Sequence, residues 1–248
     1  MASEQLTVRN SGNGIPLKGL KLGNFQPYSS DTDMITRKLI RGISVLTLGL
    51  GLITGARAQA FEGIIEFTKT TGPVATSYKY YVKGDHVRIE EISARNEVQG
   101  IMLVDMRDKT VTALSPERKL YMDVPNMRLP KDVDTKVEKS GEMKDIAGYK
   151  CEKWVVKSGA EDRVITYWVA ADEFNFFVPM LETLNRKDEQ AVFFLEITGA
   201  QGVFPMLGIE QKMDGAEVSR LEVKKITKGV QKPSLFEIPA GYNKFERN

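Results

Sequence analysis

Few residues in this sequence have the types and spacing that catalysis requires. The single histidine is His86 and the single cysteine is Cys151, so a Ser-His-Asp or Cys-His site would have to use one or both of them. No G-x-S-x-G segment is present to place a nucleophilic serine on a sharp turn. We interpret His86 as a polar residue beside a turn. Cys151 is interpreted as a small core residue, with an intermolecular disulfide or a reactive thiol as the alternative.

Metal and cofactor chemistry lack their residue patterns as well. One histidine and one cysteine cannot complete a closed tetrahedral zinc site. Asp132 and Asp134 alternate along a predicted loop, but a calcium loop needs six or more oxygens in a compact turn. The neighbours Glu90–Glu91 and Glu161–Asp162 are expected to point to opposite faces or lie in turns, and no glycine-rich phosphate loop occurs. We therefore expect no catalytic residues, no metal, no cofactor and no enzyme.

A clear targeting pattern lies at Met34–Ala60. Basic residues stand near its front, an apolar run covers Ile43–Ile53, and small side chains at Ala58–Ala60 precede Phe61. This order is typical of a secretory signal peptide cleaved after Ala60. The alternative, a membrane anchor, needs roughly twenty apolar residues, which is more than the Ile43–Ile53 run provides. Because position 61 is not cysteine, we expect no lipid tether at the mature N-terminus. Because the signal peptide is cleaved, we expect no transmembrane anchor after processing and a periplasmic or secreted protein.

The residues on either side of the signal peptide differ in character. Residues 1–33 are rich in Gly, Ser, Asn and Pro, which predicts a disordered leader. Either Met34 is the true start of the protein or the leader is translated and still permits export. Residues 61–248 are enough for a single domain. The whole chain has 35 basic and 33 acidic residues, of which residues 1–60 hold seven and three, leaving 28 basic against 30 acidic. This balance excludes a typical nucleic-acid binder.

Short alternating segments with turn residues between them follow Phe61, which is typical of an antiparallel sheet. Glycine or proline separates many of these segments, and Gly84-Asp85 is expected to close a hairpin. The expected strands cover residues 62–69, 77–83, 87–92, 98–106, 110–114, 119–124, 137–143, 149–156, 163–170, 205–213 and 217–227.

Helical spacing replaces this alternation after Asp172, which we expect to be an N-cap. The predicted helix covers Glu173–Asn185, and a second helix is expected over Glu189–Ile197, although Val192–Leu195 would also suit a strand. A turn over 233–242 is expected to bring its Leu-Phe pair into the core. The fold class is therefore α+β, mainly β: a curved antiparallel sheet with one or two helices covering its concave face.

Large apolar side chains occur on both the predicted strands and the predicted helix. They are Phe67, Tyr80, Met102, Trp154, Trp168, Phe174, Phe177 and Leu181. Two interpretations remain open, because the same residue types fill a core and line a cavity. Either the helix packs on the sheet to form a solid core, or it covers a cavity that binds an apolar ligand.

Two motifs resemble a known family. The segment I-x-G-Y-x-C-x-K-W at Ile146–Trp154 and the segment L-F-x-I-P-x-G-Y at Leu235–Tyr242 are similar to a family of exported bacterial proteins, the domain of unknown function 4412. The closing hairpin is also similar to the wider superfamily of outer-membrane lipoprotein carriers. This resemblance implies a LolA-like half-barrel with helices on its concave side, and the carriers hold acyl chains there. The arginine that carriers use in the lid or pocket matches no single position here.

These observations favour an exported, non-enzymatic cell-envelope protein that binds a lipid or other amphiphile between the sheet and the Glu173–Asn185 helix. The alternative is a periplasmic interaction or sensor module with a solid core, whose partner is an envelope protein.

Overall fold

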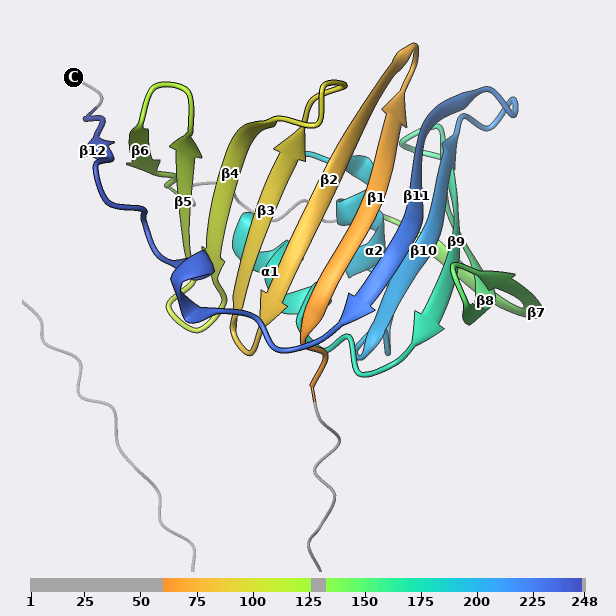
Figure 1. Cartoon of the computed structure of the whole chain (residues 1–248). Helices are drawn as coiled ribbons and strands as arrows, with labels where there is room; N and C mark the ends of the chain where they lie inside the picture. Colours follow the sequence, from red (N-terminus) through yellow and green to blue (C-terminus); the bar gives the residue numbers. More distant parts are fainter. Residues whose placement is uncertain (1–59, 126–132, 247–248) are drawn as a thin grey trace, which may run out of the picture. The chain divides into compact units, whose positions relative to one another are not determined.

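A computed structural model describes residues 60–125 and 133–246. The expected leader, the expected signal peptide apart from Ala60, and Asp132 lie outside the described residues. In the described part, all strands belong to one curved, open sheet, and the two α-helices lie on one face of it (Figure 1). The expected fold class is confirmed.

The sheet contains twelve strands among the described residues. They are β1 (Gly63–Thr71), β2 (Val74–Lys83), β3 (His86–Ile92), β4 (Val98–Asp105), β5 (Thr110–Ser115), β6 (Leu120–Asp123), β7 (Lys136–Ile146), β8 (Tyr149–Ser158), β9 (Arg163–Ala171), β10 (Val203–Gln211), β11 (Glu217–Lys228) and β12 (Asn243–Lys244). Their order is β12-β6-β5-β4-β3-β2-β1-β11-β10-β9-β8-β7. Neighbours are antiparallel except for β12, which pairs in parallel with β6. Each expected strand is therefore present, with most ends shifted by a few residues.

Tight turns join most neighbouring strands, as the turn residues predict. At the β2–β3 hairpin Gly84 has φ +54°, a left-handed conformation that glycine adopts without a steric penalty. Ala147 and Gly148 form the β7–β8 turn, with φ +50° and +83°. These turns place strands that are adjacent in sequence side by side, so the sheet grows as a meander through β6.

Helix α1 (Phe177–Leu184) begins later than expected. Its N-cap is Phe176, which has no side-chain cap, so the expected N-cap at Asp172 is wrong. The reason is tertiary: the Asp172 carboxylate forms an ion pair with Lys228, and Glu173 has a left-handed φ of +56°. Helix α2 (Glu189–Leu195) is a helix and not the alternative strand. Its N-cap Asp188 accepts a hydrogen bond from the backbone N–H of Gln190.

The core lies between the concave face of the sheet and the two helices. Phe67 on β1, Tyr80 on β2, Ile89 on β3 and Met102 on β4 lie on this face, because each is directly opposite a member of the set or shifted from it by two residues. Phe177 and Met180 of α1 are buried against it. In the described part of the chain, no helix has the length and apolarity needed to cross a membrane.

The C-terminal segment crosses the opposite, convex face (Figure 1). The short 3-10 helix η1 (Pro233–Phe236) contacts β3 there, where Arg88 Nη1 donates to the Leu235 carbonyl at 3.1 Å. Leu235 and Phe236 are only half-buried, so the expectation that they enter the main core is wrong. The segment is held by polar contacts, since the Glu62 carboxylate accepts hydrogen bonds from Lys83 Nζ at 2.9 Å and from the backbone of Gln231 at 2.7 Å.

Candidate functional site

A partly open cavity of about 150 Å³ lies between the concave face of the sheet and the two helices. Strands β1, β2, β3, β4, β9, β10 and β11 contribute to its wall, and α1, α2 and their connection close the other side. Its lining residues are Phe67, Lys69, Tyr78, Tyr80, Ile89, Met102, Tyr167, Phe177, Leu181, Leu184, Arg186, Asp188, Gln190, Ala191, Phe194, Phe204, Pro205 and Leu221. Most of them are aromatic or aliphatic, so the site is chemically suited to an apolar group.

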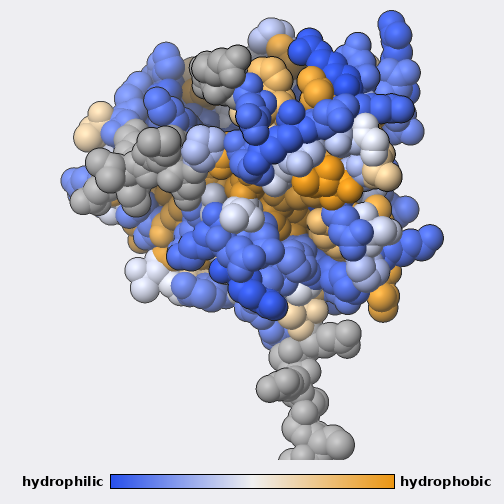
Figure 2. All heavy atoms as spheres, turned by 90° about the vertical axis from the view of Figure 1, so that its left-hand side faces the viewer, coloured by the Kyte–Doolittle hydropathy of each residue, from blue (hydrophilic) through white to orange (hydrophobic). Residues whose placement is uncertain are grey.

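The molecular surface carries apolar residues in a hollow on the side of the β12 edge. Figure 2 shows hydrophobic surface in the middle of this side, bordered above and below by hydrophilic residues. Apolar surface bounded in this way is typical of binding sites.

Five of the eight residues predicted from the sequence line the cavity. They are Phe67, Tyr80, Met102, Phe177 and Leu181. The strand residues come together because cross-strand pairs place Phe67 opposite Tyr78, and Ile89 opposite both Tyr80 and Met102. Phe177 and Leu181 are one helical turn apart and therefore point to the same side of α1.

Three predicted residues lie away from the cavity. Phe174 is fully buried in an aromatic cluster, with ring centroids 4.9 Å from Phe61 and 5.5 Å from Phe204. Trp154 packs under the Lys139 ammonium at 4.1 Å, and Trp168 faces the ammonium of Lys144 at 5.5 Å. We leave these three residues out of the proposed site.

Sequence reasoning missed several lining residues. Tyr78 carried a usable signal, because it is two residues before Tyr80 on the same strand and therefore shares its face. Tyr167, Phe194 and Phe204 carried no such signal, since their segments are apolar on both sides. These three residues line the cavity because of the way α2 packs on β9 and β10. The Tyr167 hydroxyl donates a hydrogen bond to the Gln190 carbonyl there, at 2.6 Å.

The rim of the cavity is polar and carries Lys69, Arg186 and Asp188. Lys69 Nζ pairs with one carboxylate oxygen of Asp188, whose other oxygen accepts from the Gln190 N–H at 3.1 Å. The Arg186 guanidinium donates to the sulfur of Met102. Two cations and one anion therefore stand at the opening.

Two tyrosine hydroxyl groups also stand in this wall. Burial raises the pKa of Tyr80 well above its ordinary value, and the nearby positive charge of Arg186 opposes the rise. Burial raises the pKa of Tyr78 in the same way, again opposed by Arg186 after a contribution from Glu91. Both phenols therefore stay protonated at neutral pH and keep an O–H donor at the site.

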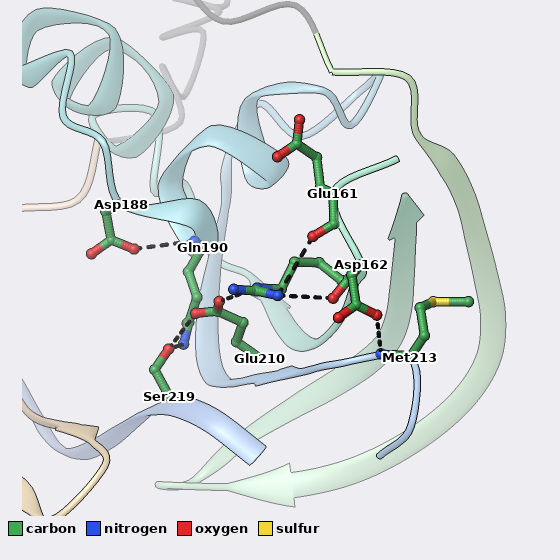
Figure 3. A network of polar contacts seen from close by, with 8 residues as sticks. Glu161, Asp162, Asp188, Gln190, Glu210, Met213 and Ser219 are labelled. Atoms are coloured by element: carbon green, nitrogen blue, oxygen red, sulfur yellow. Dashed lines mark hydrogen bonds and ion pairs between the residues drawn. The ribbon is translucent and has the colours of Figure 1, made fainter. Parts of the chain in front are cut away.

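A buried polar network fixes α2 beside the cavity (Figure 3). The Ser219 hydroxyl donates to Glu210 Oε2 at 2.6 Å and accepts from Gln190 Nε2 at 2.7 Å. Arg163 Nε donates to the other Glu210 oxygen at 2.9 Å. A side chain at Gly208 would collide with Gln190, because an added Cβ would lie 2.5 Å from its amide oxygen. Glycine at 208 therefore lets Gln190 reach Ser219.

The two residues with the strongest catalytic potential do not share a site. His86 is on β3 and Cys151 is on β8, and five strands separate β3 from β8 in the sheet. Cys151 is fully buried and unbonded to another cysteine, and burial raises the pKa of its thiol to about 11. Among residues 60–125 and 133–246, no three His, Cys, Asp or Glu side chains are grouped to hold a metal ion.

The sequence matches one family model over nearly all of the described residues. The model of the domain of unknown function DUF4412 matches residues 61–242, and the chain belongs to this family. The expectation from the two motifs is confirmed. No curated protein matches the sequence significantly.

The solved structures that align with this chain are distant in sequence. An uncharacterised conserved protein from Thermus thermophilus is 12% identical, with a TM-score of 0.45, 75% of this chain covered and 91% of that chain. The MucA/MucB complex of Pseudomonas aeruginosa contains a chain that is 9% identical, with a TM-score of 0.41 and coverage of 70% and 54%. A domain assigned to outer membrane lipoprotein sorting from Vibrio parahaemolyticus is 8% identical, with a TM-score of 0.29 and coverage of 70% and 87%.

Proposed function

We propose that this DUF4412 protein is an exported, non-enzymatic protein of the cell envelope that binds an amphiphile. The apolar part of the ligand enters the cavity between the concave sheet and helices α1 and α2. The observation that carries the proposal is a hollow in the apolar interior, because a protein interior is normally packed without voids of this size. A solid interior is what an interaction module without a ligand would have.

The composition of the wall supports an apolar occupant. Aromatic rings of Phe67, Phe177, Phe194 and Phe204 face the space from both the sheet and the helices. Buried aromatic and aliphatic surface favours apolar ligands by about 25 cal/mol for each Å² removed from water. The polar groups gather at the rim, so an amphiphile would enter with its tail first.

The volume sets the size of the buried group. An apolar cavity of about 150 Å³ holds a benzene-sized molecule, which corresponds to on the order of six carbons. A short alkyl chain or a single aromatic ring fits this space. Because the cavity is partly open, a chain of about eight carbons would keep its outer carbons and head group at the rim. Only a much longer acyl chain would require α1 or α2 to move away from the sheet.

Export is the second part of the proposal. It rests on the signal-peptide pattern of Met34–Ala60, which ends directly before the first buried residue of the fold, Phe61. Sequencing the N-terminus of the protein from the periplasm of an expressing bacterium tests it. A mature protein that starts at Phe61 agrees with the proposal, and retention of residues 1–60 contradicts it.

Binding is tested with a neutral ligand, so that charge plays no part. Titration of the purified mature protein with 1-hexanol and 1-octanol, followed by calorimetry and by NMR saturation transfer, should show saturable binding at one site. Ala191→Trp places an indole in the cavity wall and should abolish this binding. Ala75→Phe, an exposed position on β2 outside the cavity lining, is the matched control and should bind normally. Failure of both alcohols to bind the wild type contradicts the proposal.

A further inference from the structure

We infer that the rim of this cavity selects an amphiphile with an anionic head group, specifically a carboxylate, and that Arg186 is the residue that holds it. This inference rests on the proposed function, since it requires the cavity to take the apolar tail. It concerns the charge of the ligand, which the apolar wall cannot determine.

The first observation is how the charged residues at the rim are paired. Asp188 has both oxygens occupied, one by Lys69 Nζ and one by the N–H of Gln190. Lys69 is therefore neutralised by Asp188. The guanidinium of Arg186 remains, so the three charged lining residues carry a net charge of +1. Glu91, whose charge contributes to the raised pKa of Tyr78, lies outside the lining.

The second observation is the partner of Arg186. Its guanidinium donates to the thioether of Met102, which is a weak acceptor. Among the described residues, no carboxylate forms an ion pair with Arg186. A guanidinium has five N–H donors in a planar fork that matches the two oxygens of a carboxylate, and a single donation to a thioether does not use that fork.

The third observation is the position of Arg186 relative to the apolar wall. Met102 is itself a lining residue, so the contact keeps the guanidinium against the cavity. The Tyr78 and Tyr80 hydroxyls, whose pKa values respond to Arg186, are in the same wall. A carboxylate at this point would meet a cation and O–H donors while its chain extends inward.

A surface arginine that only contacts water is the competing explanation, and it makes a different prediction. Under our inference, octanoate should bind the wild type about fivefold more tightly than 1-octanol, as expected for one partly exposed ion pair. Octylammonium, which has the same chain and the opposite charge, should bind more weakly than 1-octanol. The preference for octanoate should shrink as salt is raised from about 0.05 M to about 0.5 M, since salt screens exposed charges.

Substitution of Arg186 completes the test. Arg186→Met should remove the preference, so that octanoate and 1-octanol bind this variant with affinities within about twofold of each other. Arg186→Lys should retain part of it, because the charge remains and the fork is lost. Lys187→Met is the matched control, since Lys187 is the exposed neighbour of Arg186 and lies outside the cavity lining. It should leave the preference intact.

The outcomes separate the inference from the proposed function. If neither octanoate nor 1-octanol binds the wild type, the proposed function fails and the inference fails with it. If both bind equally and Arg186→Met changes nothing, the cavity binds apolar tails and the carboxylate site is refuted. If Lys187→Met removes the preference as fully as Arg186→Met, the effect comes from overall charge and the assignment to Arg186 is refuted.

Discussion

Removing the hydroxyl of Ser219 should destabilise the protein by loosening helix α2. In the network beneath α2, this hydroxyl contacts both Gln190, at 2.7 Å, and Glu210, at 2.6 Å. All three side chains are buried. Ser219→Ala therefore leaves one amide N–H and one carboxylate oxygen without their partner, in a place that bulk water does not reach.

The expected magnitude follows from these two groups. Each buried polar group left without a partner costs about 1–3 kcal/mol. Glu210 keeps its bond to Arg163, so we expect a total loss of about 2–4 kcal/mol in the free energy of unfolding. For a domain of this size, 1 kcal/mol lowers Tm by about 2–4 °C, which predicts a fall in Tm of roughly 4–16 °C.

Thermal unfolding followed by circular dichroism measures the change, and Ser77→Ala is the control. Ser77 is exposed on β2, so its substitution should change stability by less than about 0.5 kcal/mol. Hydrogen exchange should also show faster exchange of the α2 amides in Ser219→Ala than of the β2 amides. A Tm within about 1 °C of the wild type would refute the reasoning that this network holds α2 in place.

Three further predictions concern the core, the thiol and the C-terminal segment. Phe174→Ala should lower the free energy of unfolding by about 3–5 kcal/mol, whereas Phe245→Ala, at a side chain 51% exposed, should change it by less than about 1 kcal/mol; equal effects in urea unfolding would contradict the assignment of Phe174 to the core. Because burial raises the pKa of Cys151 from 9.0 to about 11, the folded state holds this proton more tightly, so stability is kept below pH 9 and falls as pH rises toward about 11. The urea midpoint of the wild type should therefore decline between pH 8 and pH 11, and the midpoint of Cys151→Ala should decline less over the same range. An equal decline in both proteins would contradict the role of the buried thiol. Hydrogen bonds from the Gln231 backbone and, to a smaller extent, from Lys83 lower the pKa of Glu62 below 4.5. The stabilisation by the Glu62 carboxylate is therefore present above pH 4.5 and is lost as the pH falls through the pKa of Glu62 in the folded state. Limited proteolysis of residues 229–242 should accelerate on acidification in the wild type, and Glu62→Gln should be cut faster already at pH 7; equal rates at pH 7 would show that Glu62 does not hold the segment.

The strands could be predicted from the sequence because their signals are local. Alternation and turn glycines act over a few residues, and the turn at Gly84 needs only the glycine itself. The start of α1 could not be predicted in this way. Asp172 has the residue type of an N-cap, but its carboxylate pairs with Lys228, far along the chain on β11, and no local pattern contains that contact.

The candidate site was predictable only in part, for a similar reason. Phe67, Tyr80 and Met102 are on neighbouring strands with alternating side chains, so their common face follows from simple periodicity. Trp154 and Trp168 are also large apolar residues, but Trp154 is on β8, which contributes no lining residue. Trp168 directly follows the lining residue Tyr167 on β9, so its side chain points to the opposite face of the sheet. Arg186 follows α1 in the connection between two helices, where no periodicity marks a functional side chain.

The two edges of the sheet differ in how they meet another strand. At one edge the chain's own β12 covers β6, in the parallel direction. At the other, β7 pairs only with β8 among the described residues, and almost its entire length is exposed. Unpaired edges invite polymerisation, and lysines along an edge oppose it. Strand β7 carries three lysines, Lys136, Lys139 and Lys144. Their charges therefore oppose pairing of this edge strand with a second copy of the protein, which is the first step toward a fibre.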